Sequence, residues 1–194
     1  MHSTHVLPFY VVCDVSYSMM DHIDAVNDSL RDLHRAIGSD PHVADTIRFC
    51  LIGFSASPEI VVPLGRPCEI TELSGLTVQA ASNFGAVFSF LREAITRDVE
   101  RLSERARVCR PAVFFLSDGQ PTDPSSWPAS FAALTDVDWT ARPNMIAYGI
   151  GDADPVTIGR IGTFRTFLGQ DGVSPGAALH AVARSLLESA LEPG

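Results

Sequence analysis

Apolar runs along the chain predict six β-strands. The runs over residues 7–13 (LPFYVVC) and 111–117 (PAVFFLS) show no polar alternation, which is typical of strands buried on both faces of a parallel sheet. Pro58 separates two further runs, so a short connection there predicts an antiparallel hairpin. The other predicted strands are residues 46–55, 59–64, 143–151 and 163–168, the last of them at a sheet edge.

Between the strands, apolar residues recur at spacings of three and four, which predicts amphipathic helices. The first helix carries a stripe from Ile23 to Ile37, and we expect Gly38 to end it. A long helix follows from Phe84 to Leu102, whereas Pro128 predicts a short one within 125–137. The other helical signals are Asp154 and Pro155 as a cap and first turn, and a last helix over 177–191 with Val182, Leu186 and Leu187 inside.

Strands that alternate with helices predict an α/β fold: a doubly wound, mostly parallel sheet with one antiparallel edge strand and helices on both faces. Residues 65–82 are punctuated by glycine and proline and predict an irregular segment. No repeat, low-complexity tract or linker divides the chain. We therefore predict a single domain over residues 1–194, with a core of about residues 7–192.

Composition narrows the class of protein. The formal net charge is −9 and no basic run occurs, so we expect no nucleic-acid partner. No apolar run is long enough to span a bilayer, and the start of the sequence lacks a signal-peptide pattern, which predicts a cytoplasmic protein without a membrane partner. The four cysteines show no CxxC spacing, so we interpret them as reduced core residues.

Oxygen-bearing side chains gather where the predicted strands end. Asp14, Ser16 and Ser18 follow the first strand at alternate positions, Asp118 follows the strand over 111–117, and Ser82 precedes the long helix. The carboxyl ends of parallel strands are where α/β sheets bind ligands. A set of hard oxygen ligands without His or Cys suits Mg²⁺, Mn²⁺ or Ca²⁺ rather than Zn²⁺.

Each of these residues also has a simpler interpretation. Asp14, Ser16, Ser18 and Ser82 are all of types preferred at helix N-caps, and Asp118 with its glycine could form a plain turn. Thr122 and Asp123, in GQPTD, suit a site rim or turn chemistry equally well. Tyr17 and Phe84 could flank a site or simply pack.

Four regions of the sequence together resemble a von Willebrand factor type A (VWA) domain: LPFYVVCDVSYSM with IDAVNDSL, SNFGAVFSFLREAI, PAVFFLSDGQPTD and NMIAYGIGDAD. The resemblance is nearest to compact bacterial VWA proteins associated with tellurium resistance. It implies a Rossmann-like fold and a metal-ion-dependent adhesion site (MIDAS). Asp14, Ser16 and Ser18 match the first MIDAS motif, Ser82 stands where threonine is usual, and Asp118 matches the last aspartate.

In such families the hydroxyls commonly bind the ion directly, and a carboxylate from a partner protein fills the remaining position. The family usually has glycine where this chain has Tyr17. The resemblance implies a metal-dependent protein-binding module, an adaptor in a stress-response or tellurium-resistance-like complex, with Mg²⁺ as the expected ion. We expect no enzymatic activity, because the sequence has no G-x-S-x-G, G-x-x-x-x-G-K-[ST] or H-E-x-x-H motif. Two alternatives stay open: a Mg²⁺-dependent phosphohydrolase or phosphotransferase with Asp14 as nucleophile, and a VWA scaffold that needs no metal.

Overall fold

The computed structural model of the protein describes residues 5–191, and the side chains of residues 5–185. The predicted inward positions Leu186 and Leu187, and the predicted core boundary at residue 192, therefore lie outside the described side chains. In chain order, the elements are β1 (His5–Asp14), η1 (Tyr17–Met19), α1 (Ile23–Ser39), α2 (Pro41–Thr46), β2 (Ile47–Phe54), β3 (Pro58–Gly65), η2 (Pro67–Glu69), α3 (Phe84–Ser103), β4 (Arg107–Val108), β5 (Ala112–Ser117), α4 (Trp127–Leu134), β6 (Asn144–Gly149), α5 (Pro155–Ile161), β7 (Arg165–Leu168), η3 (Gly169–Asp171) and α6 (Pro175–Leu191).

The strands form one mixed sheet in the order β3-β2-β1-β5-β6-β7, and the short β4 pairs with the start of β1. All neighbouring strands are parallel except β2 and β3, which form the predicted antiparallel hairpin at one edge. The predicted fold class is confirmed. From β1 the chain proceeds to β2 on one side, and later returns to β5 on the other. The carboxyl ends of β1 and β5 therefore flank a topological switch point, where α/β sheets bind ligands.

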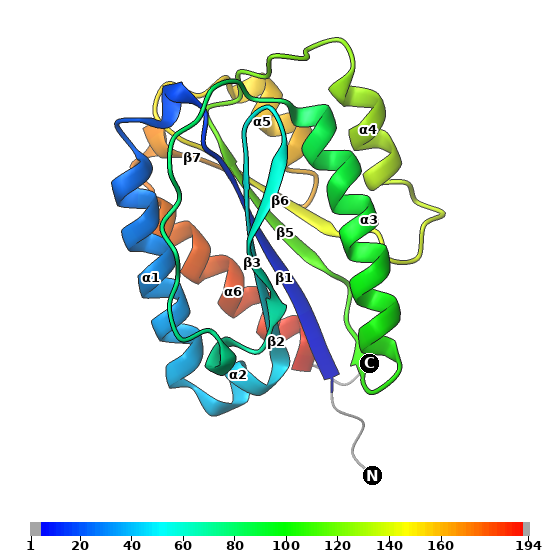
Figure 1. Cartoon of the computed structure of the whole chain (residues 1–194). Helices are drawn as coiled ribbons and strands as arrows, with labels where there is room; N and C mark the ends of the chain where they lie inside the picture. The colour runs from blue at the N-terminus through cyan, green and yellow to red at the C-terminus, as the bar shows by residue number, and fades with distance from the viewer. Residues whose placement is uncertain (1–4, 192–194) are drawn as a thin grey trace.

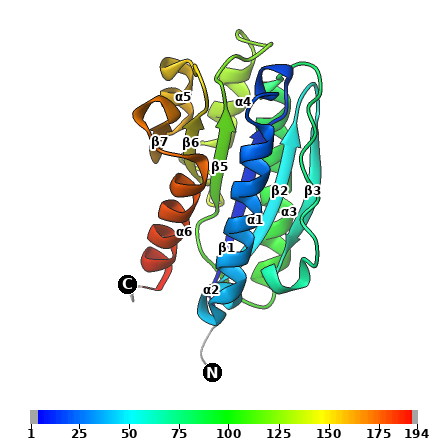
Figure 2. The same ribbon diagram turned by 90° about the vertical axis from the view of Figure 1, so that its left-hand side faces the viewer.

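Helices cover both faces of the sheet. The helices α1 and α6 lie on one face, in front in Figure 2, and α3 and α4 lie behind. Successive residues of β1 alternate between the two cores: Phe9 and Val11 pack toward α1 and α6, whereas Tyr10 and Val12 pack toward α3, α4 and α5. This double burial explains why the strand sequences contain almost no polar residues.

Aromatic rings dominate the core beneath α3 and α4. Phe84 and Phe115 pack edge to face at 5.1 Å between ring centroids, and Phe88 stands 5.3 Å from the same Phe115 ring. Trp127 of α4 completes the group at about 6 Å from Phe84 and Phe88. Phe84 is fully buried, so of its two predicted roles the structure supports packing. This rigid cluster anchors the first turn of α3, next to the strand ends.

Three local features differ from the predictions. The helix α1 continues through Gly38 to Ser39, because the chain turns only at Asp40. Asp40 caps α2 by accepting hydrogen bonds from two main-chain N–H groups, with Pro41 in its first turn. The short elements α2 and β4 were not predicted. No helix in the described part of the chain is long and apolar enough to cross a membrane.

Candidate metal centre

The carboxylate of Asp14, the last residue of β1, is the hub of a buried hydrogen-bond network. Its Oδ1 accepts from the main-chain N–H of Ser16 at 2.9 Å. Its Oδ2 accepts from two hydroxyls, Ser82 Oγ and Ser117 Oγ, each at 2.7 Å. Asp14 is 0% exposed. Three segments that lie far apart in the sequence therefore meet at one carboxylate. The end of β1 and the start of α3 lie at the same end of the fold (Figure 1).

Asp118 directly follows Ser117 and brings a second carboxylate to the same strand end. Its Oδ1 accepts from the main-chain N–H of Gln120 at 3.1 Å. Its Oδ2 is buried without a hydrogen-bond partner, alone in this among the buried side-chain nitrogen and oxygen atoms of the described residues. Such an atom costs free energy unless a ligand or ion compensates it. The Oδ2 atom of Asp118 is therefore a candidate ligand for a cation.

The turn after Asp118 depends on Gly119. Its φ of +74° is accessible to glycine at little cost, and a Cβ would stand 3.1 Å from the carbonyl oxygen of Asp154. The main-chain N–H of Gly119 donates to Ser117 Oγ at 3.0 Å, which orients that hydroxyl toward Asp14. The Ser-Asp-Gly sequence thus positions both the hydroxyl and the second carboxylate.

Ser16 and Ser18 place two hydroxyls beside each other in the loop after β1. Their Oγ atoms are 3.0 Å apart, with Ser16 buried and Ser18 exposed. Neither serine caps a helix through its side chain, and α1 begins after His22 without a side-chain cap. The capping interpretation is therefore wrong for this pair. Two adjacent hydroxyls, one inside and one at the surface, can share a ligand.

Ser82 reaches Asp14 from a conformationally strained loop. Ala81, immediately before it, has φ +71° and is the one non-glycine residue with positive φ among those described. Such conformations cost of order 1 kcal/mol and cluster at functional sites. Ser82 is not the cap of α3, because Asn83 accepts from Ala86 N–H in that role. Its carbonyl instead accepts two hydrogen bonds from Thr122, at 2.8 and 3.0 Å.

The loop between β3 and α3 is fixed to the strand ends by a chain of hydrogen bonds. Gln79 donates its main-chain N–H to the carbonyl of Val15 at 2.6 Å, and its side chain accepts from Ser55 Oγ at 2.8 Å. Asn83 N–H then donates to the Ser55 carbonyl at 2.8 Å. The loops that carry Asp14 and Ser82 are thereby held together before any ligand binds.

Two residues of this region were not predicted with these roles. Ser117 donates to Asp14, whereas the sequence predicts it only as the end of its strand. Asp123 accepts from Phe84 N–H at 2.9 Å and Gly85 N–H at 2.8 Å, which caps α3 from a distant segment. The signal for Ser117 was its position beside Asp118 in Ser-Asp-Gly. No local pattern links Asp123 to a helix that begins 39 residues earlier.

The donor set fits a hard divalent cation. Burial raises the pKa of Asp14, and hydrogen bonds from Ser117, Ser16 and Ser82 oppose this rise by favouring the charged form. No group of three or more His, Cys, Asp or Glu side chains suited to a metal occurs within residues 5–185. A cation here would therefore need hydroxyls beside the two carboxylates, and an all-oxygen set of this kind suits Mg²⁺, Mn²⁺ or Ca²⁺.

Apolar side chains and a cavity flank the strand ends. Tyr17 is 64% exposed and Met20 57% exposed, both in or beside the η1 turn that follows Ser16. A cavity of about 320 Å³ adjoins the same loops, and its lining includes Val15, Ser55 and Gln79. The surface around the two carboxylates therefore offers contact area as well as charge.

No family model matches the sequence, and the search of curated proteins finds no match. Solved structures do match. A von Willebrand factor type A protein from Catenulispora acidiphila is 12% identical with a TM-score of 0.66, over 96% of this chain and 43% of that one. The PilB minor pilin from Streptococcus sanguinis, as a D319A mutant, is 9% identical with a TM-score of 0.70, over 100% of this chain and 65% of that one.

A third matching structure has zinc bound at its MIDAS motif. The proximal thread matrix protein 1 from the mussel byssus, described with a zinc-occupied MIDAS motif, is 14% identical with a TM-score of 0.60, over 96% of this chain and 46% of that one. This chain spans less than half the length of the mussel and Catenulispora proteins. Together with the strand order and the single antiparallel edge, these similarities show that the chain has the fold of a von Willebrand factor type A domain.

Proposed function

We propose that this chain is a protein-binding module whose partner recognition depends on a divalent cation at the candidate metal centre. The proposed ligands are the oxygen atoms of Asp14, Ser16, Ser18, Ser82 and Asp118, directly or through water. The observation that carries the proposal is the buried, unpartnered Oδ2 of Asp118, one residue from the hydroxyl that binds Asp14. A cation there would compensate that oxygen, which otherwise costs free energy.

Mg²⁺ is the proposed ion, with Mn²⁺ and Ca²⁺ as substitutes. Two carboxylates balance the charge of one divalent cation, and the three hydroxyls are neutral. These five oxygens leave a position in octahedral coordination, which an anionic oxygen from a partner would fill. The mussel protein with a zinc-occupied MIDAS motif supports a divalent cation on this fold. The network around Asp14 supports pre-organisation, because its acceptors are already oriented by Ser16, Ser82 and Ser117.

The proposed partner is a protein that supplies an Asp or Glu side chain. Exposed Tyr17 and Met20, with the cavity lined by Val15, Ser55 and Gln79, would contact the residues around that acid and provide specificity. Similarity to the PilB minor pilin supports protein binding as the proposed role of this chain. The sequence resemblance further supports an adaptor role in a cytoplasmic stress-response complex of the tellurium-resistance kind.

An orienting role fits Asp14 better than a nucleophilic one: the hydroxyls of Ser82 and Ser117 donate to it and keep their lone pairs free, so Asp14 would act on a cation through them or through water. Its two oxygens already accept three hydrogen bonds, and the residue is fully buried. A nucleophile that attacks phosphorus needs an accessible oxygen. We therefore propose a module without enzymatic activity.

Calorimetric titration with Mg²⁺ tests the proposal. We expect Asp118→Asn to weaken Mg²⁺ binding by at least about 10-fold, because the charge that attracts the ion is removed while the side-chain shape is kept. The control is Asp32→Asn, which removes an exposed carboxylate paired with Arg35 on α1 and should leave Mg²⁺ affinity unchanged. Equal Mg²⁺ affinity in the wild type and Asp118→Asn would show that Asp118 does not bind the ion.

Partner dependence is tested by the same pair of variants. A partner captured by the wild type in Mg²⁺ should be released by EDTA, and Asp118→Asn should fail to capture it while Asp32→Asn succeeds. A partner that stays bound in EDTA would instead indicate the metal-independent scaffold.

A further inference from the structure

A second cavity, of about 470 Å³, lies at the opposite end of the sheet from the candidate metal centre. Its lining includes Val6 and Arg48, the second residues of β1 and β2, whereas the metal centre lies at and beyond the last residue of β1. Eight steps of strand separate Val6 from Asp14, about 26 Å at ~3.3 Å per residue. The two sites share no residue.

Four arginines line this second cavity, which we call the arginine cavity: Arg48 of β2, Arg66 after β3, and Arg101 and Arg105 at the end of α3. Two carboxylates, Glu69 and Glu104, also line it, so the charged lining residues leave a net charge of about +2. The whole chain has a formal charge of −9 and contains no lysine. The arginine cavity therefore concentrates guanidinium groups in an acidic chain, and two of them are paired with carboxylates beside the cavity, Arg66 with Asp45 and Arg101 with Asp98.

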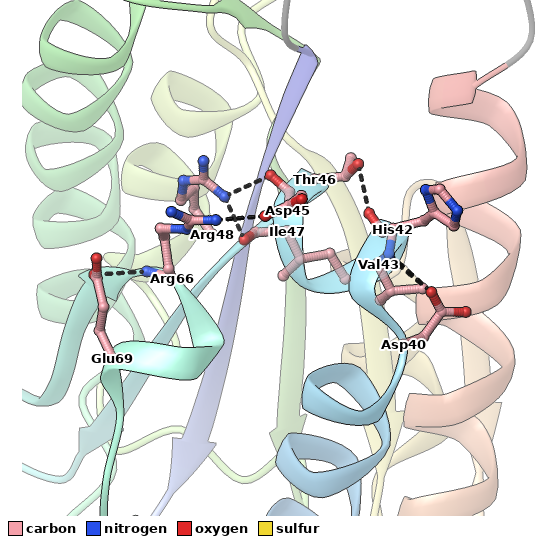
Figure 3. A network of polar contacts seen from close by, with 9 residues as sticks. All are labelled: Asp40, His42, Val43, Asp45, Thr46, Ile47, Arg48, Arg66 and Glu69. Atoms are coloured by element: carbon pink, nitrogen blue, oxygen red, sulfur yellow. Dashed lines mark hydrogen bonds and ion pairs between the residues drawn. The ribbon is translucent and has the colours of Figure 1, made fainter.

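Arg48 is held rigidly but without a carboxylate partner. Its Nη1 donates to the main-chain carbonyls of Asp45 and Ile47, both at 2.9 Å (Figure 3). No carboxylate of the described residues lies within ion-pair distance of it. Partial burial, and then the charge of Arg66, lower the pKa of Arg48. The charges of Glu69 and Asp45 oppose this shift without forming an ion pair, so the charged form of Arg48 is only partly compensated and a bound anion would add to that compensation.

Arg66 lies beside Arg48 and is only partly compensated. Its guanidinium pairs with the carboxylate of Asp45, and its main-chain N–H donates to Glu69 Oε2 at 3.2 Å (Figure 3). Two neighbouring guanidinium groups repel each other, and the Asp45 carboxylate pairs with Arg66 alone, whereas Arg48 bonds only the main-chain carbonyl of Asp45. This arrangement fixes two planar donors on one wall of the cavity.

The other wall contributes donors from the end of α3. Arg101 donates to the Leu64 carbonyl at 3.3 Å and stands 3.5 Å from Asp98, both long contacts. The side chain of Arg105 makes no hydrogen bond or ion pair within residues 5–185. Arg105 and much of Arg48 therefore retain N–H donors for a ligand, since each guanidinium carries five.

We propose that the arginine cavity binds a small molecule that carries a phosphate group. A phosphate monoester has close to two negative charges near neutral pH and several acceptor oxygens, which match the net charge and the planar forks of the lining. A volume of about 470 Å³ is within the range of small-molecule sites and exceeds what one phosphate fills. The acidic remainder of the protein disfavours a nucleic-acid polymer.

Calorimetry with inorganic phosphate and pyrophosphate, at low ionic strength in buffer freed of metal by chelating resin, tests the proposal. We expect Arg48→Gln and Arg105→Gln each to weaken pyrophosphate binding by about 10-fold, because each removes a charged donor. Arg184→Gln, an exposed arginine on α6 outside the cavity, is the matched control and should bind as the wild type does. Glu104→Gln should tighten binding several-fold, because it removes a repelling charge from the lining.

Three results would overturn the inference: no binding of either phosphate probe, an equal loss in Arg184→Gln, or binding of citrate without binding of pyrophosphate. Circular dichroism checks that Arg48→Gln folds. Should it unfold, exposed Arg105 still provides the test, because its side chain supports no described contact. The metal-free buffer removes Mg²⁺ from the measurement, so failure here is separate from failure of the proposed metal centre.

Discussion

The two ends of the sheet hold their charges in different ways. At the carboxyl end, Asp14 and Asp118 are 0% and 6% exposed, and main-chain and hydroxyl donors orient their oxygens. At the amino end, the side chains of Arg66 and Arg101 are 46% and 59% exposed. Buried, oriented charges favour a small ion of defined geometry, whereas exposed guanidinium groups adapt to a larger anion.

This difference has an energetic consequence. An unliganded buried carboxylate destabilises the fold, because charge is taken out of water without full compensation. An exposed arginine has no such cost, and salt screens its contribution to binding. We therefore expect stability to depend on ligand mainly at the carboxyl end. The predictions below separate the two ends, from the largest effect to the smallest.

The largest expected effect is Asp14→Ala on Mg²⁺ binding. Removal of the hub carboxylate leaves the hydroxyls of Ser82 and Ser117 without their acceptor, so both charge and geometry are lost. We expect Mg²⁺ affinity to fall at least about 100-fold, or about 2.7 kcal/mol. Pyrophosphate affinity should be unchanged, because the arginine cavity lies about 26 Å away. Calorimetry with both ligands on one preparation measures this.

The reciprocal variant completes that test. Arg105→Gln should keep wild-type Mg²⁺ affinity while it loses pyrophosphate affinity. A loss of both ligands in either variant would mean that the two ends are coupled or that the fold is damaged, and the comparison between them would no longer hold.

The sequence predicts the fold well because helices cover both faces of the sheet, so each buried strand has an almost entirely apolar sequence. The apolar run over 7–13 and the stripe from Ile23 to Ile37 have no competing interpretation of similar strength. The elements that were missed are short. The six residues of α2 and the two of β4 carry too few positions for any period to show.

The candidate site was predictable in part for the same reason. Because the carboxyl ends of parallel strands lie at one edge of the sheet, the sequence predicts that Asp14 and Asp118 lie at that edge. Ser82 donates to Asp14 across 68 residues, as that prediction requires. The cap formed by Asp123 and the convergence of Arg48 with Arg105 were not predictable. Both depend on where irregular segments return in space, which no local pattern encodes.

A smaller effect is expected for Asp14→Asn in the metal-free protein. Asparagine keeps the shape, and the hydroxyls of Ser82 and Ser117 can rotate to accept its N–H groups. Because a buried charge is removed, we expect the free energy of unfolding in EDTA to rise by about 1 kcal/mol near neutral pH. Urea denaturation measures it. At the other end, Arg105→Gln should change stability by less than about 0.5 kcal/mol.

The difference in unfolding free energy between Asp14→Asn and the wild type should depend on pH with a defined sign. Burial raises the pKa of Asp14 in the folded state, so the folded protein binds the proton more tightly than the unfolded chain. Wild-type stability from this group therefore rises as the pH falls through the raised pKa. The advantage of Asp14→Asn should shrink over the same range. An advantage that stays constant down to acid pH would show that charge burial is not its cause.

The smallest effect is expected for Ala81→Gly, which relieves strain beside the metal centre without touching a ligand. Alanine at φ +71° is strained, and glycine adopts this conformation freely but loses more chain entropy on folding. We expect the two terms to leave a gain in stability of about 0.5 kcal/mol, measured by thermal denaturation in EDTA. Mg²⁺ affinity should fall two- to three-fold, because the looser loop orients the Ser82 hydroxyl toward Asp14 less strictly.

Gly38→Ala, in the last turn of α1, tests the opposite change at a helical glycine with no atom within 4 Å of the new Cβ. It should stabilise the fold without any change in Mg²⁺ affinity. If Ala81→Gly instead destabilises the metal-free protein and leaves Mg²⁺ binding intact, the strain at Ala81 does not serve the carboxyl-end site.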